Sequence, residues 1–122
     1  MINQEKLNEI GNKLMNEMPE VEGIIFADNE GNILAGQTIT EMDHDKIVKT
    51  ALEVLKDSIS LSDAIDKGKL EVIYTCYERG YVVTVYSDKI ILIALLGKDA
   101  ASSLGLIVTA MKNTIKNILN NL

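Results

Sequence analysis

Hydrophobic residues recur at two spacings in the first part of the chain, one typical of helices and one typical of strands. From residue 4 to residue 18 they fall at every third or fourth position, which predicts an amphipathic helix that Pro19 ends. Residues 21–28 contain four consecutive apolar residues, Ile24, Ile25, Phe26 and Ala27, which predict a strand buried on both faces. Turn formers at 28–31 separate it from a second short strand at 32–35, so we expect a β-hairpin.

A long amphipathic segment follows at residues 41–59. Thr40 and Asp43 fit a capping box, in which a threonine oxygen and an acid three residues later bond the first backbone N–H groups of a helix. The apolar residues of this segment cover an arc of roughly 160°, wider than the ~100° that one packing surface needs. They are Ile47, Val48, Ala51, Leu52, Val54, Leu55 and Ile59. The helix therefore has apolar surface to spare. Its opposite face carries Lys46, Lys49, Glu53, Lys56 and Asp57.

Three strands are predicted in quick succession at 70–77, 81–87 and 90–96, joined by links too short for a parallel crossover. They form an antiparallel sheet, and the third strand, which is apolar on both faces, is expected at its centre with helices on each side. Asp99 is the expected cap of a final helix whose apolar positions continue to Leu122. The order of elements predicts an α+β domain with helices on both faces of one antiparallel sheet.

The link between the first two of these strands sets their register. We expect Gly80 to take the left-handed position of a three-residue loop. Tyr77 then lies opposite Tyr81, and Tyr74 lies opposite Thr84 on the other face. All four tyrosines of the chain fall on this hairpin, which strand propensity explains and which an aromatic interface would also explain.

Composition indicates a single folded domain that spans residues 1–122. Hydrophobic residues make up 47% and charged residues 25%, as in an ordinary globular protein. The net charge of −6 repels phosphate backbones and anionic membrane surfaces, so we expect no nucleic-acid partner. The longest apolar run, at 90–96, is too short to cross a membrane, and the polar N-terminus predicts no secretory signal. Together with a lone cysteine, Cys76, these features favour a cytoplasmic protein without direct membrane insertion.

No constellation of residues in the sequence indicates catalysis. Gly97 and Lys98 resemble the end of a phosphate-binding loop, but Leu92 and Asp99 stand where that motif needs glycine and Ser or Thr. A strand-to-helix turn is the better interpretation. With one histidine, His44, neither a His-based zinc triad nor a Ser-His-Asp relay is available within one chain. We therefore expect no enzyme activity of its own, no cofactor and no resident metal.

Three further features of the sequence each allow two interpretations. The acidic cluster with a histidine at 41–45 is typical of a helix start, with weak metal binding as the alternative. Cys76 is interpreted as a small core or interface residue, with redox use as the alternative. Arg79, at a hairpin tip, is interpreted as a solvated charge, with an arginine finger as the alternative.

Three stretches of the chain resemble the roadblock / dynein light chain family. They are the first hairpin at 23–35 (GIIFADNEGNILA), the long helix from Glu41, and residues 103–107 (SLGLI) at the start of the last helix. The order of elements agrees with that family from end to end, so the resemblance covers nearly the whole chain. It implies a five-stranded antiparallel sheet with the second helix on one face and the first and last helices on the other, a layering similar to that of profilin.

The resemblance also implies a homodimer. Members of the family usually pair their third strands, here residues 70–77, and set their second helices side by side, which would account for the surplus apolar arc. The residues that we expect at the dimer interface are Val48, Leu52, Ile59, Leu70, Val72, Tyr74 and Cys76. The residues that we expect to bind a further partner are Lys46, Lys49, Glu53 and Lys56.

Bacterial and archaeal members of that family are similar to regulators of small Ras-like GTPases, which they activate or scaffold without catalytic residues of their own. We therefore interpret the chain as a cytoplasmic homodimeric interaction module of prokaryotic type that regulates or scaffolds such a GTPase. The alternative is a purely structural dimerisation module of a larger motor, filament or scaffold assembly. A small-molecule sensor with a cleft beside the sheet is a third interpretation.

Overall fold

The computed structural model describes residues 3–121 and contains one antiparallel sheet of five strands in the order β2-β1-β5-β4-β3. In chain order the elements are α1 (Gln4–Glu17), β1 (Val21–Ala27), β2 (Ile33–Thr38), α2 (His44–Ile65), β3 (Val72–Tyr77), β4 (Gly80–Tyr86), β5 (Ile91–Gly97), the 3₁₀ turn η1 (Lys98–Ser103) and α3 (Leu104–Asn120). Strand β5 lies at the centre, as predicted, and β2 and β3 form the two edges.

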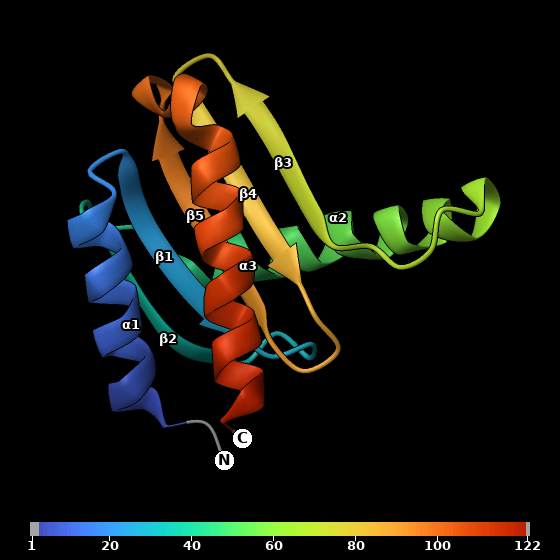
Figure 1. The fold of residues 1–122 in the computed structure, drawn as a ribbon, viewed down its shortest axis with the longest axis horizontal. Helices are drawn as coiled ribbons and strands as arrows, with labels where there is room; N and C mark the ends of the chain where they lie inside the picture. Colours follow the sequence, from blue (N-terminus) through green and yellow to red (C-terminus); the bar gives the residue numbers. More distant parts are fainter. Residues whose placement is uncertain (1–2, 122) are drawn as a thin grey trace.

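Helices cover both faces of the sheet, and α2 lies on the face opposite α1 and α3 (Figure 1). Side chains alternate between the faces along each strand. In β1, Ile24 and Phe26 pack in the core beneath α1 and α3, whereas Ile25 packs beneath α2. In β5, Leu92 packs in the core beneath α1 and α3, and Ile93 packs in the core beneath α2. The predicted α+β sheet with one helix on one face and two on the other is therefore confirmed, and the two cores explain the continuous apolar runs at 24–27 in β1 and 91–96 in β5.

Helix α2 begins later and ends later than the sequence predicts. The N-cap is Asp43 rather than Thr40, and its side chain accepts a hydrogen bond from the Lys46 N–H at 3.1 Å. The helix continues past residue 59 to Ile65, where Asp66 ends it in the left-handed conformation with φ of 51°. Its C-terminal half extends beyond β3, off the edge of the sheet (Figure 1). Part of the apolar face of α2 therefore has no strand beneath it.

The β3–β4 hairpin has a two-residue loop, so the predicted three-residue loop and its register are wrong. Gly80 does not take a positive φ but opens β4, where it lies against β5. A Cβ atom at this position would lie 2.2 Å from the carbonyl oxygen of Leu96, so the glycine is required by close packing rather than by the turn. The observed pairs are Tyr77 with Gly80, Cys76 with Tyr81, Tyr74 with Val83, and Ile73 with Thr84.

Helix α3 is preceded by η1, so Asp99 lies inside a 3₁₀ turn and does not cap α3 as predicted. Gly97 and Lys98 form the junction between β5 and this turn, in agreement with the expected strand-to-helix connection. Leu122, predicted on the apolar face of the last helix, lies outside the described residues. Within residues 3–121, no helix combines the length and the apolar character that a membrane span requires.

Candidate functional site

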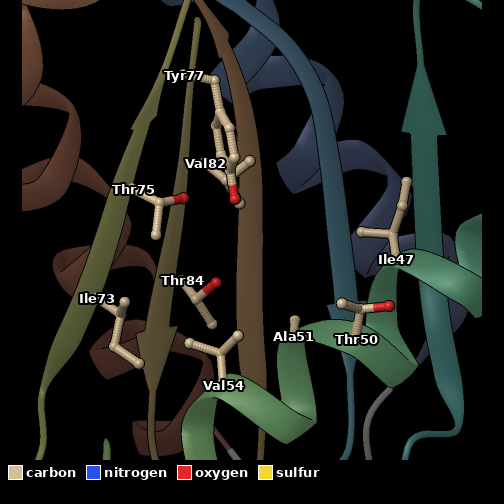
Figure 2. Close-up of a pocket in the computed structure, with 9 residues that line it drawn as sticks. All are labelled: Ile47, Thr50, Ala51, Val54, Ile73, Thr75, Tyr77, Val82 and Thr84. Carbon is tan, nitrogen blue, oxygen red and sulfur yellow. The ribbon is translucent and has the colours of Figure 1, made fainter.

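A groove lies between α2 and the strands β3 and β4, with a volume of about 210 Å³. Side chains from the helix and from the two strands point into the same space (Figure 2). Most of the groove surface is apolar, with threonine hydroxyls from both sides. Its lining residues are Ile47, Thr50, Ala51, Val54, Ile73, Thr75, Tyr77, Val82 and Thr84.

The apolar side of α2 continues past the sheet edge. Val54, Leu61 and Ile65 expose 42%, 57% and 48% of their surface, which is unusual for large aliphatic side chains on one helix. Beyond β3, Leu61 and Ile65 line a second groove of about 550 Å³, formed with the segment 67–74. The surplus apolar arc predicted for this helix is thus observed as exposed surface, and it is longer than expected.

Charged residues occupy the other flank of α2. Lys49, Glu53 and Lys56 line a groove of about 550 Å³ that is closed on its far side by the β1–β2 turn, including Asn29 and Glu30. The Asn29 side-chain amide donates a hydrogen bond to the carbonyl of Asp88, which ties this turn to the β4–β5 turn. Three of the four predicted partner-binding residues therefore meet in one groove. The fourth, Lys46, is exposed near the start of α2 and does not line the groove.

The outer edge of β3 presents backbone groups that β4 does not use. The Tyr86 N–H donates to the Glu71 carbonyl at 2.9 Å, just before β3 begins. Since hydrogen-bonded pairs alternate along an antiparallel ladder, the odd-numbered residues of β3 form the backbone hydrogen bonds with β4. Val72, Tyr74 and Cys76 consequently direct their N–H and C=O groups away from the sheet. Such an edge is a template for pairing with another strand.

The residues predicted for the dimer interface differ in how far the structure exposes them. Tyr74 is 60% exposed and Cys76 is also exposed, both on the free edge strand, whereas Val72 and Leu70 are half-buried. Val48 is only 1% exposed and packs in the core beneath α2, so its side chain lies inside one chain and not on its surface. The periodicity of α2 did not separate this core position from its exposed neighbours.

Two further residues predicted for the interface lie on the charged flank of α2. Leu52 is half-buried, and Leu52 and Ile59 line the groove with Lys49 and Lys56 rather than the groove beside β3. The predicted interface residues on α2 are thus spread around the helix, and the residues that lie beside β3 are others.

Lys98 lies close to Cys76 at the end of β3. Its Nζ is 3.3 Å from Cys76 Sγ, donates to the Tyr77 carbonyl at 3.1 Å, and lies 4.9 Å from the centre of the Tyr81 ring. The hydrogen bond with Cys76 raises the pKa of Lys98 above its ordinary value. Lys98 therefore stays charged, and its contacts with Cys76 and Tyr77 hold the end of β3 in the β3–β4 hairpin.

The remaining candidate residues lie on other elements. His44 is half-buried, and its Nε2 lies 3.2 Å from the Thr38 hydroxyl. Within residues 3–121, no group of three His, Cys, Asp or Glu side chains is arranged to hold a metal ion. Asp28 organises the β1–β2 turn by accepting hydrogen bonds from the N–H groups of Glu30 and Asn32, each at 2.9 Å. Arg79 lies in the exposed β3–β4 turn.

Sequence reasoning missed the exposed residues at the two ends of α2. Leu61 and Ile65 continue the helical spacing of Val54, but the many polar residues at 57–63 made this spacing hard to recognise in the sequence. Ile39 and Met42, in the loop before the helix, are 68% and 47% exposed and follow no periodic pattern. The first pair was detectable from the 3.6-residue period, whereas the second was not.

The five-stranded antiparallel sheet with three helices is an α+β fold, and its open edge strand lies beside an exposed apolar helix face. The family model for the Roadblock/LC7 domain matches residues 7–96. The chain belongs to the Roadblock/LC7 family, as its sequence resemblance implied.

Solved structures share the whole fold at low sequence identity. MglB of Myxococcus xanthus is 11% identical, with a TM-score of 0.83 over 96% of this chain and 97% of that one. The gliding protein MglB of Thermus thermophilus is 12% identical, with a TM-score of 0.84 over 98% and 92% of the two chains. Profilin IB of Acanthamoeba castellanii is 14% identical, with a TM-score of 0.65 over 91% and 94%. No curated protein matches the chain.

Proposed function

We propose that this chain is a homodimeric interaction module that regulates or scaffolds a small Ras-like GTPase, and that it works in the cytoplasm. The observation that carries the dimer is the free edge of β3 next to the exposed apolar side of α2. A strand edge and an adjoining apolar face are covered together when two copies meet about a two-fold axis. A surface of this kind left open would invite aggregation.

The proposed GTPase surface is the charged flank of α2. Lys49, Glu53 and Lys56 share one groove, and Lys46 lies near it on the outward side of the helix. Mixed charges at the rim of an interface serve orientation and specificity more than affinity. The proposal also takes support from the prokaryotic MglB structures that share this fold, one of which is described as a gliding protein.

The module acts by positioning its partner and contributes no catalytic residue. Arg79 belongs to the β3–β4 turn, on a different element from the charged groove of α2. In this mechanism, any increase in GTP hydrolysis comes from ordering residues of the GTPase itself.

A structural role in a larger assembly is the second candidate function. The observation in its favour is that a similar structure, at 11% identity and a TM-score of 0.82, is described as MglB with a tetrameric arrangement. In this case the exposed surfaces serve only to join copies and neighbours, and nucleotide turnover is unaffected.

Association kinetics with a panel of purified small Ras-like GTPases, each loaded with GDP or a GTP analogue, tests the proposal. We expect at least one to bind, and we expect Lys49→Glu with Lys56→Glu to slow its association at least tenfold without loss of the dimer. The matched control is Lys13→Glu with Lys116→Glu, which changes net charge equally on α1 and α3, on the other face of the sheet. Failure of every GTPase to bind favours the structural role, and equal effects of the two pairs would move the contact surface elsewhere.

A further inference from the structure

Charge is distributed unevenly along the chain, and the acidic part builds one side of the sheet. Residues 14–45 hold eight Asp or Glu residues and no Lys or Arg, whereas the rest of the chain holds ten acids and twelve bases. This segment forms the end of α1, the strands β1 and β2, and the loop that leads into α2. The negative charge is therefore concentrated on the β2 side of the sheet, opposite β3 (Figure 1).

Strand β2 is the second open edge of the sheet. The Ile39 N–H donates to the Glu22 carbonyl at 2.9 Å, so the backbone of Ile39 bonds toward β1. Because inward and outward residues alternate along an antiparallel strand, Gly36 and Thr38 direct their N–H and C=O groups away from β1. Both residues are partly exposed. The proposed homodimer uses the β3 edge and leaves β2 open in each copy.

Two exposed apolar side chains lie just beyond the end of β2. They belong to Ile39, which is 68% exposed, and Met42, which is 47% exposed. Acids surround them, since Glu22 lies opposite Ile39 on β1, and Glu41 and Asp43 flank Met42 in the loop, all three exposed. Apolar surface bordered by acids is complementary to a segment that carries both apolar and basic side chains.

We infer that the β2 edge binds an extended, basic segment of a partner protein, which adds a strand to the sheet. Main-chain hydrogen bonds with Gly36 and Thr38 supply affinity, as in other cases of strand addition. Ile39 and Met42 contact apolar side chains of the segment, and the nearby carboxylates select lysine or arginine. This role goes beyond the proposed GTPase role, which uses α2, and does not depend on it.

A second copy of this chain is a poor occupant of the same edge. If two β2 strands paired antiparallel, the loop after β2 in one copy would lie beside the β1–β2 turn of the other. Glu41 and Asp43 of one copy would then approach Asp28 and Glu30 of the other, and like charges at close range oppose such a pair. A basic segment instead meets opposite charge at both ends of β2.

An NMR titration with a defined peptide tests the inference. The probe is a nine-residue peptide of alternating lysine and valine with blocked ends, added to the isotope-labelled chain. We expect saturable binding, with slower amide hydrogen exchange at Gly36 and Thr38 and shifted amide signals of Ile39 and Met42. The same peptide with glutamate in place of lysine should not bind.

Two results of this titration overturn the inference. One is that the lysine peptide fails to bind, or that both peptides bind alike. The other is that Gly36 and Thr38 become protected without peptide when the protein concentration is raised, which would assign the β2 edge to a second copy of the chain.

Variants at Thr38 separate the strand edge from side-chain effects. Thr38→Pro removes an outward N–H and no hydrogen bond of the β1–β2 ladder, a place where an edge strand tolerates proline. We expect it to weaken peptide binding at least tenfold. Thr38→Val is the matched control, because it keeps the N–H and removes only the hydroxyl that contacts His44. It should bind within about threefold of the parent chain, and equal effects of the two variants would overturn the inference.

A charge reversal decides the question if Thr38→Pro impairs folding, which its thermal unfolding reveals. Glu22→Lys with Glu41→Lys should weaken binding of the lysine peptide at least tenfold. Asp57→Lys with Asp63→Lys changes the net charge equally at two exposed positions of α2 and should leave binding within about threefold. Equal losses in the two pairs would mean that the peptide responds only to net charge, which contradicts a site at β2.

Discussion

Gly80 of β4 lies so close to the backbone of Leu96 in β5 that a Cβ atom there would be 2.2 Å from the Leu96 carbonyl oxygen. The obstacle is main chain in the central strand, which cannot move aside like the end of a flexible side chain. The glycine thus allows β4 to approach β5 at the start of their pairing, where Gly80 faces Gly97. The position of the β3–β4 hairpin depends on this contact.

Gly80→Ala is therefore expected to lower the free energy of unfolding by about 1–3 kcal/mol, the usual range for overpacking a tight site. Gly105→Ala is the matched control, because a Cβ atom there meets nothing within 4 Å. Gly105 lies in α3, where alanine is the better helix former, so this variant should gain up to about 1 kcal/mol. Urea denaturation at one fixed protein concentration measures both, and equal stabilities of the two variants would contradict the close contact.

The hairpin also illustrates what local sequence rules cannot decide. A glycine next to a turn has two common uses, a positive φ or a close approach, and the residues around Gly80 fit either use. Only the location of β5, brought in from a later part of the chain, distinguishes them. In contrast, the central place of β5 was predictable, because a strand that is apolar on both faces needs cover on both sides.

The limits of α2 were harder to predict than its existence. Both Thr40 and Asp43 are good capping residues, and in the structure it is Asp43 that accepts from a helix N–H, while the Thr38 hydroxyl contacts His44 Nε2 across the preceding loop. At the other end Asp66, and not a glycine, takes the left-handed conformation that ends the helix, and Gly68 with φ of 86° follows two residues later. The two grooves depend on how far α2 overhangs β3, and this is a property of the packed sheet and not of any one segment.

Tyr74→Lys is expected to weaken the dimer at least tenfold, which corresponds to about 1.4 kcal/mol. Tyr74 lies on the free edge strand and is 60% exposed, so a lysine is tolerated in one chain but brings a charge into a strand pair that must exclude water. Leu106→Lys is the control, since it places the same charge at an exposed apolar position on α3. Sedimentation velocity over a dilution series measures both, and an unchanged Tyr74→Lys dimer would exclude pairing through β3.

Arg79→Ala tests whether the module acts by positioning. Arg79 is exposed in the β3–β4 turn, the one place in this chain from which an arginine side chain extends. Loss of a true arginine finger lowers GTP turnover by about 10³-fold or more. We expect a change far smaller than this in single-turnover hydrolysis by the reconstituted pair, and a loss of that size would replace the positioning mechanism with direct insertion.

The contact between Lys112 and Glu71 predicts a specific response to acid. Lys112 Nζ in α3 donates to Glu71 Oε1 at 2.6 Å, and this hydrogen bond and the lysine charge hold the pKa of Glu71 below its ordinary value of 4.5. The pKa of Glu71 is thus lower in the folded chain than in the unfolded chain. The contact therefore stabilises the fold at a pH above the pKa that Glu71 has in the unfolded chain. This stabilisation is lost as the pH falls through the pKa that Glu71 has in the folded chain. Lys112→Met should return the pKa of Glu71 to near its ordinary value.

Carboxyl NMR titration of the folded chain measures this change directly, with Lys116→Met as the control one turn further along α3. Glu71→Gln should make the stability less sensitive to pH below about 4.5, because the carboxylate that must be protonated is gone. Glu71 directly precedes β3, so its contact with α3 joins the last helix to the start of the edge strand. A Glu71 pKa that does not respond to Lys112→Met would mean that α3 does not hold this end of β3 through the ion pair.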